Sequence, residues 1–232
     1  VTVTVNISKP EAPSFTGTIS VDEEGLADGT NPDATSETAT WTAPDGYTIV
    51  SVSDGKLGTV VKTGDTTLDY TLSDAITHPA GSGENTATGA DSFEVTIMDG
   101  DGNTYTVKVD VDVTDDVPTI SADSLSKDVA SGAEVTGRVD IDYGADNEGG
   151  QKSLTVNGQK GTAAEDGKLS FDLENGTLVF DPATGGYEFT AKANVTTDQT
   201  LEFVVTDADG DTDEVTVTVN ISKPEAPSFT GT

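Results

Sequence analysis

The sequence contains no cysteine and only one histidine among its 232 residues. Disulfide bonds are therefore excluded, and zinc or iron–sulfur sites built on Cys and His ligands are not expected. Apolar residues make up 33% of the chain, and no apolar run approaches the roughly 20 residues of a membrane-spanning helix. Small domains without disulfides often use a bound metal ion in their place.

Basic residues are also scarce, because 11 Lys and Arg stand against 42 Asp and Glu, for a formal net charge of −31. Such a surface repels the phosphates of nucleic acids and anionic membranes, and it attracts divalent cations. We therefore expect neither a nucleic-acid partner nor membrane insertion. High charge with modest hydrophobicity is also typical of disordered chains, but the apolar residues here are strongly patterned, which favours a folded protein.

The most informative feature is a long repeat, because residues 1–18 (VTVTVNISKPEAPSFTGT) recur without a mismatch at residues 215–232. The sequence then contains one full repeat and the beginning of the next, as in a tandem array. An artificial duplication of the ends is the alternative. The repeated segment combines a strand with a linker and makes sense as a repeat junction, which favours the array. Arrays of near-identical units favour a spacer over an enzyme.

Short segments of alternating apolar and polar residues, rich in Val and Thr, predict half-buried antiparallel strands. They are residues 1–5, 93–97, 105–113, 201–205 and 215–221. Pairs typical of turns separate the strands: Asp54-Gly55, Asn157-Gly158, Asp166-Gly167 and Asn175-Gly176. No segment has sustained helical periodicity. The fold class predicted is all-β, with tandem immunoglobulin-like sandwich modules joined end to end.

The linker prolines Pro13, Pro118 and Pro227 lie one immunoglobulin-like domain apart. We therefore predict the end of a preceding repeat at residues 1–12, modules at 13–117 and 118–226, and the start of the next repeat at 227–232.

Two acidic turns share the frame D-x-D-G-[ND]-T-x-x-V-x-V, at residues 99–109 and 207–217. Acidic side chains at alternate positions of a tight turn point several oxygens at one centre, as Ca²⁺ requires, and the glycine lets the backbone bend. Neither turn is an EF-hand, because strands flank it and its glycine falls at position 4. The candidate ligands are Asp99, Asp101, Asn103, Asp207, Asp209 and Asp211. The alternative is a hairpin turn with solvated carboxylates.

Topology adds further candidates at the junction between the modules. In a seven-stranded sandwich, the turn before the last strand lies beside the linker that leads into the module, here residues 114–118. The second strand of this module is expected to end at residues 139–142, which brings the following loop, 143–148, to the same end. The candidates there are Asp115, Asp116, Asp142, Asp146 and Glu148. Clustered like charges repel unless cations lie among them.

Two further segments bear on cation binding or stiffness, one acidic and one rich in proline. Asp22 and Glu23 follow the first expected strand and form either another cation site or a solvated turn. The first junction has the linker ISKPEAP at residues 7–13, which offers few acids. Its Pro10 and Pro13 fix φ and limit bending.

The DADGDT turn with its V-x-V-x-V strand, the DDVPT linker and the VDEEGL segment together resemble extender repeats of RTX adhesins. These are giant, type I-secreted surface proteins of Gram-negative bacteria, including biofilm adhesins. The resemblance implies repeated β-sandwiches, bound Ca²⁺ and a spacer that holds a distal ligand-binding domain away from the cell. ISKPEAP lacks the paired Asp of the family's linkers.

An enzyme is not predicted, because no nucleophile, metalloprotease or nucleotide-binding motif is present, and His78 lies in a Pro/Gly-rich stretch typical of a surface loop. The alternative function is an adhesive module that binds a glycan or peptide. Trp41, Tyr47, Tyr143 and Tyr187 are its candidate platform, unless they are core residues, as Trp41 in the second strand suggests. The expected partners are neighbouring repeats of the same chain, and the chain is expected to be monomeric.

Overall fold

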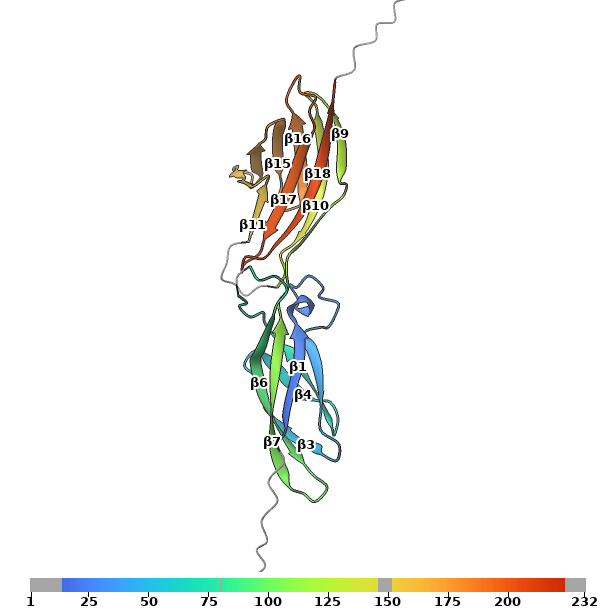
Figure 1. The fold of residues 1–232 in the computed structure, drawn as a ribbon, viewed down its shortest axis with the longest axis vertical. Helices are drawn as coiled ribbons and strands as arrows, with labels where there is room; N and C mark the ends of the chain where they lie inside the picture. The colour runs from blue at the N-terminus through green and yellow to red at the C-terminus, as the bar shows by residue number, and fades with distance from the viewer. Residues whose placement is uncertain (1–13, 80, 146–151, 224–232) are drawn as a thin grey trace, which may run out of the picture. The chain divides into compact units, whose positions relative to one another are not determined.

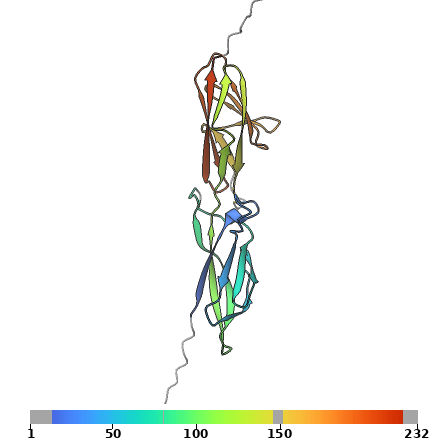
Figure 2. The ribbon, with the colours of Figure 1, turned by 90° about the vertical axis from the view of Figure 1, so that its right-hand side faces the viewer.

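The computed structural model describes residues 14–79, 81–145 and 152–223, and these divide into two compact units. Unit 1 comprises residues 14–27, 31–76 and 85–115, and unit 2 comprises residues 28–30, 77–84 and 116–223 within the described ranges. In each unit the strands run side by side along a common direction (Figures 1 and 2). The predicted strand at residues 1–5 lies outside the described residues.

Unit 1 consists of two facing sheets with a single turn of 3-10 helix, η1 (Glu23–Gly25). The first sheet has the order β1-β7-β6-β3 and the second the order β2-β5-β4. The strands are β1 (Thr16–Asp22), β2 (Thr38–Thr42), β3 (Thr48–Val52), β4 (Gly58–Lys62), β5 (Thr67–Leu72), β6 (Thr86–Met98) and β7 (Thr104–Thr114). Neighbouring strands are antiparallel except β1 and β7, which pair in parallel. This division of seven strands is that of an immunoglobulin-like sandwich.

The alternation read from the sequence explains why these segments are strands. Along β7, Val107, Val109, Val111 and Val113 are fully buried, and the intervening residues are exposed or half-buried. Successive side chains of a strand point to opposite faces, so this pattern buries one face of the sheet. Trp41 on β2 is 8% exposed and confirms the prediction of a core tryptophan in the second strand.

Unit 2 has a larger pair of sheets, with the orders β13-β14-β15-β16-β10-β8 and β12-β11-β17-β18-β9. Figure 1 shows β11, β17, β18 and β9 side by side. The strands are β8 (Thr119–Ala122), β9 (Ser126–Ala130), β10 (Glu134–Asp142), β11 (Ser153–Val156), β12 (Gln159–Lys160), β13 (Thr162–Ala163), β14 (Leu169–Asp172), β15 (Gly176–Phe180), β16 (Gly186–Ala191), β17 (Gln199–Thr206) and β18 (Thr212–Ser222). Aromatic residues from both sheets, among them Phe180, Phe189 and Phe203, fill the core between them.

Unit 2 confirms that the strand expected at residues 139–142 ends at Asp142. This strand, β10, is the second of the sandwich, and it comes third in chain order because the first strand of the sandwich is split. Its first part, β8, pairs antiparallel with β10, and its second part, β9, pairs in parallel with β18 in the other sheet. The predicted Asn157-Gly158 turn is confirmed, since both residues have positive φ, 50° and 71°, as a two-residue hairpin of type I′ requires.

Within the described ranges, no helix has the length and apolar character needed to cross a membrane.

Candidate metal centre

The acidic side chains that are buried in the described part of the chain coincide closely with the predicted ligands. They are Glu23, Asp91, Asp115, Asp116, Asp207 and Asp211, and each is at most 5% exposed. All of them except Asp91 belong to the predicted set. An ionised carboxylate is costly to bury unless hydrogen-bond donors or cations compensate its charge, so the partners of each carboxylate decide what it can do.

The turn from Asp207 to Asp211 is the most tightly built of the predicted sites. Asp207 Oδ1 accepts hydrogen bonds from the backbone N–H groups of Gly210 (2.9 Å) and Asp211 (2.7 Å), and its own N–H donates to the Asp211 carbonyl (3.1 Å). Gly210 has φ of +107°, a conformation that residues with a side chain rarely adopt. The D-x-D-G pattern therefore encodes this backbone, as the sequence indicated.

This turn leaves carboxylate oxygens without donors. Asp209 and Asp211 each present a carboxylate oxygen within 4.8 Å of the other. Both oxygens of Asp209 and Oδ2 of Asp211 are buried and have no hydrogen-bond partner, and Asp211 Oδ1 accepts from the Gly83 N–H at 2.7 Å. Two buried carboxylates so close together, with three unfilled oxygens, fit a hard cation such as Ca²⁺, whose ligands are oxygens.

The equivalent turn in unit 1 shares the closing backbone hydrogen bond, from the Asp99 N–H to the Asn103 carbonyl (3.0 Å), and a positive-φ glycine, Gly102, but its side chains have different partners. Asp99 Oδ1 accepts from the N–H groups of Asp101 (3.0 Å) and Asn103 (2.9 Å), as Asp207 Oδ1 does from its turn. Asp99 Oδ2 accepts from the Asn103 side-chain amide (2.9 Å) and the Tyr105 hydroxyl (3.1 Å). The hydrogen bond from the Asn103 side chain is the main cause of a lowered pKa of Asp99.

Proton donors thus fill both oxygens of Asp99, whereas Asp101 and Asn103 are exposed. The structure does not gather these three side chains around a centre as it gathers Asp209 and Asp211. At the positions of Asn103 and Tyr105, the second turn has Asp211 and Asp213, so two donors are replaced by two carboxylates.

At the start of unit 2, the side chain of Asp116 organises the backbone around it. Its Oδ2 accepts from the N–H groups of Ala145 (2.9 Å) and Thr30 (2.8 Å), and the Thr30 hydroxyl donates to Oδ1. Gly144 has φ of +69°, and a Cβ there would lie 2.9 Å from the Asp116 carbonyl oxygen, which explains the glycine. The first residues of the 143–148 loop therefore lie beside the linker, as the topology predicted.

The remaining candidates of this loop differ in their placement. Asp142 is exposed, and its Oδ1 accepts from the Gly144 N–H at 3.1 Å. Asp146 and Glu148 lie outside the described residues. Near the start of the last strand, Asp213 accepts from the Ile120 N–H at 2.8 Å. This hydrogen bond connects the beginning of β8 to the beginning of β18.

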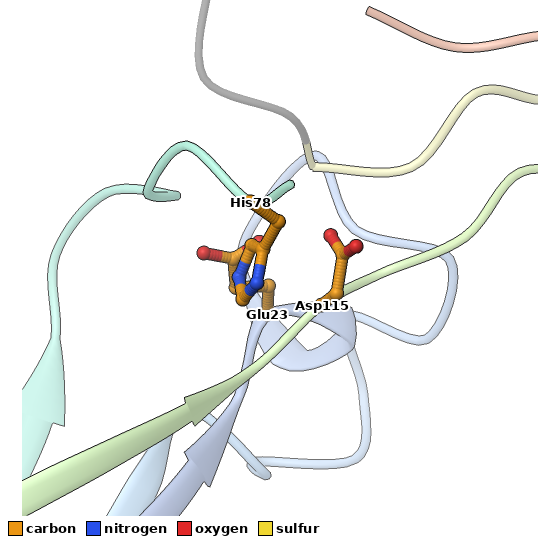
Figure 3. Close-up of side chains that lie close together, drawn as sticks. All are labelled: Glu23, His78 and Asp115. Carbon is orange, nitrogen blue, oxygen red and sulfur yellow. The ribbon is translucent and has the colours of Figure 1, made fainter. Parts of the chain in front are cut away.

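A second pair of predicted ligands meets within unit 1. Glu23 on η1 and Asp115 after β7 each offer a carboxylate oxygen within 4.8 Å of the other (Figure 3). Asp22 caps η1 by accepting from the Glu24 N–H at 3.0 Å, Glu23 Oε1 accepts from the Ile76 N–H at 2.6 Å, and Asp115 Oδ2 accepts from the Asn85 side chain at 3.0 Å. Glu23 is fully buried, so the alternative of a solvated turn is wrong for this residue.

The sequence reasoning missed Asp91, whose charge is compensated by donors. The N–H groups of Lys56 and Leu57 and the Tyr70 hydroxyl all donate to it at 2.9 Å. Burial alone would raise the pKa of Asp91, but the hydrogen bonds from Lys56, Leu57 and Ser92 and from Tyr70 lower it overall. The sequence pattern could have revealed Asp91. Phe93, Val95 and Ile97 alternate as inward-facing residues, and the position two residues before Phe93 on the same face is Asp91.

Two predictions about aromatic and histidine residues can be compared with the structure. Tyr187 is 3% exposed and, like Trp41, belongs to a sandwich core, so neither can present a ring face to a ligand. Tyr47 and Tyr143 are half-buried. His78, also labelled in Figure 3, belongs to unit 2 and lies in a loop as expected, but its side chain is 5% exposed, so the expectation that this loop places it at the surface was wrong.

Comparison with known proteins adds to this picture. Residues 115–220 match the family model of the bacterial Ig domain. The bacterial Ig match runs from the linker through β8 and into β18, and so covers most of unit 2. It confirms the all-β, immunoglobulin-like fold class. No curated protein matches the chain.

Several solved structures are similar in fold. Domains 4 and 5 of the S-layer protein SbsC are 20% identical, with 78% of this chain and 72% of that one covered and a TM-score of 0.28. Titin domains Z1Z2 in complex with telethonin are 13% identical, with coverage of 91% and 93% and a TM-score of 0.39. Domains EC3–6 of protocadherin gammaB7 are 16% identical with a TM-score of 0.32, and the match covers 93% of this chain and 47% of that one.

Proposed function

We propose that this chain is a spacer segment of a bacterial surface adhesin, and that Ca²⁺ stabilises and stiffens its immunoglobulin-like units. The observation that carries the proposal is the set of buried carboxylate oxygens without donors, on Asp209 and Asp211. The role is structural and non-catalytic, and the distal end of the full adhesin would bear the ligand-binding domain.

The electrostatics of the turn argue for a bound cation. Two ionised carboxylates within 4.8 Å repel each other strongly when water is excluded. A bound positive ion would offset this repulsion, and no Lys or Arg is paired with either residue among the ion pairs of the described ranges. A divalent ion offers the larger compensation, and flexible carboxylates suit Ca²⁺ better than the smaller Mg²⁺.

The position of the acids along the chain connects cation binding to stiffness. Asp115 ends the last segment of unit 1 and Asp116 begins the longest segment of unit 2, so the peptide bond between them lies at a boundary between the units. We propose that Ca²⁺ bound by Glu23 and Asp115 in unit 1, and by the Asp207–Asp211 turn in unit 2, restricts motion about this bond. The Asp142–Glu148 segment is proposed to add ligands.

The surface-adhesin part of the proposal rests on the tandem repeat and on the resemblance to RTX extender repeats. A perfect copy of 18 residues, one period apart, is expected of an array selected for length. Secretion by a type I system and exposure on a Gram-negative cell surface belong to this proposal.

The two equivalent turns supply a matched test. Asp209→Asn and Asp101→Asn make the same chemical change at the same turn position, in unit 2 and unit 1 respectively. Isothermal titration with Ca²⁺, together with calorimetric melting of unit 2, is expected to show that Asp209→Asn abolishes one binding event and the Ca²⁺-dependent rise in melting temperature. Asp101→Asn is expected to retain both. Equal Ca²⁺ responses of the two variants would contradict the proposal.

A further inference from the structure

The strand β4 forms one edge of the smaller sheet of unit 1. It is the last strand in the order β2-β5-β4, and β5 is its only sheet neighbour in the described part of the chain. Just before β4, the Leu57 carbonyl accepts from the Ser73 N–H at 2.9 Å, and just after it the Thr63 N–H donates to the far side of the same hairpin. Because successive residues of an antiparallel strand alternate between bonding toward and away from the neighbour, every second residue between them faces outward. The backbone groups that point away from β5 are those of Gly58, Val60 and Lys62.

The central outward-facing donor of this edge already has an acceptor, which comes from a side chain. The Val60 N–H donates to Asp54 Oδ1 at 3.0 Å. Asp54 is exposed and lies in the connection between β3 and β4, so it is not part of a strand. Its carboxylate oxygen therefore occupies the position at which a neighbouring strand would place a carbonyl oxygen. Among the side-chain hydrogen bonds of the described residues, this is the one that reaches a backbone group of β4.

The larger sheet of unit 1 ends in β3, and the edge of β3 is occupied by groups of the same unit. The Ile49 N–H donates to the Asp65 carbonyl at 2.7 Å, and the Lys62 ammonium group donates to the Ile49 carbonyl at 2.7 Å. The pairing of β3 with β6 also shifts register between Ile49 and Ser51, and such bulges interrupt the regular pairing that an incoming strand would need. Hydrogen bonds and a bulge therefore protect β3, whereas β4 is regular and depends on Asp54.

The local charge makes this edge a place where two copies of the chain can approach. Residues 46–64, which contain β3 and β4, have two Lys and one Asp, a net charge of +1, whereas the whole chain carries −31. Like charge keeps copies of the chain apart over an acidic surface, but this segment lacks that protection. Val50 and Val61 add exposed apolar surface, at 51% and 59% exposure. A regular edge strand with β-branched side chains and few charges favours pairing with another strand.

We propose that Asp54 keeps the chain monomeric by blocking β4, and that the partner it excludes is β4 of a second copy of this chain. Two β4 edges related by a twofold axis pair antiparallel, and each then offers the N–H and C=O groups that the other needs. The tandem array inferred from the repeat would hold several such edges in one molecule, which raises their local concentration. The role of Asp54 does not depend on Ca²⁺ or on the proposed spacer function.

Three variants of the whole chain separate the hydrogen bond of Asp54 from its charge. Asp54→Ala removes both, whereas Asp54→Asn removes the charge and keeps an amide oxygen that can accept from the Val60 N–H. Asp65→Ala removes a charge from an exposed side chain near the same edge and keeps the carbonyl that accepts from Ile49. In sedimentation equilibrium in excess Ca²⁺, we expect Asp54→Ala to self-associate at least about tenfold more tightly than the parent. Asp54→Asn and Asp65→Ala are expected to match the parent.

Amide hydrogen exchange tests whether β4 is the strand that pairs. In the parent, the Val60 N–H is expected to be protected from exchange at every protein concentration. In Asp54→Ala it should exchange faster in dilute solution and regain protection as the concentration rises, because a partner strand then supplies the missing acceptor. Asp54 is exposed, so its replacement removes no core contact. Denaturant unfolding followed by the fluorescence of Trp41, the only tryptophan, checks that unit 1 remains folded in each variant.

Four results would overturn the proposal. An Asp54→Ala variant as monomeric as the parent would show that β4 needs no blocking group, and a parent that already pairs through β4 would show that Asp54 does not block it. Equal self-association of Asp65→Ala would mean that charge alone keeps the copies apart. Self-association of Asp54→Ala without renewed protection of the Val60 N–H would mean that the contact lies elsewhere on the molecule.

Discussion

The hydroxyl of Tyr70 donates a hydrogen bond of 2.9 Å to Oδ2 of Asp91, and both side chains are buried in unit 1. Together with the N–H groups of Lys56 and Leu57, this bond surrounds a buried carboxylate with donors. Asp91 thus shows how this chain buries a negative charge without a cation. Asp209 and Asp211 together have three buried oxygens without donors, and we propose that a cation compensates their charge.

We expect Asp91→Asn to destabilise unit 1 by about 3 kcal/mol. The NH₂ group of the new amide would face N–H and O–H donors that the carboxylate oxygens of Asp91 now accept from. Tyr70→Phe removes a single hydrogen bond to a charged group and is expected to cost about 1.5 kcal/mol. Denaturant unfolding followed by Trp41 fluorescence measures unit 1 selectively, since this is the only tryptophan. The control is Asp110→Asn on the half-buried face of β7. A Tyr70→Phe variant as stable as the parent would show that the hydrogen bond between Tyr70 and Asp91 contributes nothing to stability.

The lowered pKa of Asp91 predicts a pH dependence with a definite sign. Its folded-state pKa lies below the unfolded value of about 3.9, so its stabilisation is fully present above about pH 5 and is lost as pH falls through the folded-state pKa. The difference in unfolding free energy between the parent and Asp91→Asn should therefore shrink with acidification. Taking this difference cancels the relief of repulsion that acid brings to a chain of net charge −31. A constant difference from pH 6 to pH 3 would mean that Asp91 does not titrate with folding.

Calcium is expected to raise the melting temperature of unit 2 more than magnesium does at equal concentration. Binding to the folded state stabilises it by about 2.7 kcal/mol per site at a hundredfold excess over the dissociation constant. Such a gain corresponds to a rise in melting temperature of about 10–20 °C for a unit of about 100 residues. Calorimetry in each ion and in chelator measures the shift in melting temperature. An equal shift in Mg²⁺ would refute a site whose flexible carboxylates prefer the larger ion.

Replacing both Asp115 and Asp116 with Asn is expected to widen the distribution of angles between the units in millimolar Ca²⁺. The double variant removes one carboxylate from the Glu23–Asp115 pair and weakens the acceptor for the Ala145 N–H. Small-angle scattering should show a smaller mean extension than in the parent. The matched control is Asp166→Asn with Asp172→Asn, which changes the net charge equally at exposed positions. If the linker variant scatters like the parent, the linker carboxylates are not ligands, and stiffness must come from proline and packing.

Much of the fold followed from local pattern. The alternation at residues 105–113 and 215–221 became β7 and β18, and Asn157-Gly158 became a type I′ turn, because side-chain period and glycine conformation are properties of neighbouring residues. The D-x-D-G frame likewise encoded, in both turns, the same closing hydrogen bond and a glycine of positive φ. The splitting of the first strand of unit 2 between two sheets did not follow, since its two parts differ only in which distant strand accepts them, β10 or β18.

The sequence by itself determined which residues are acidic, how they are spaced and that two turns close with the same hydrogen bond over a positive-φ glycine. Only the tertiary structure decided which of these acids are buried and what surrounds them. Asp99 and Asp207 occupy the same turn position, yet the amide of Asn103 and the hydroxyl of Tyr105 fill the oxygens of Asp99, while Asp209 and Asp211 are left with buried oxygens that lack donors. The physical reason is that burial and hydrogen bonding depend on partners from remote segments, such as Gly83 for Asp211 and Tyr70 for Asp91, which no local motif contains.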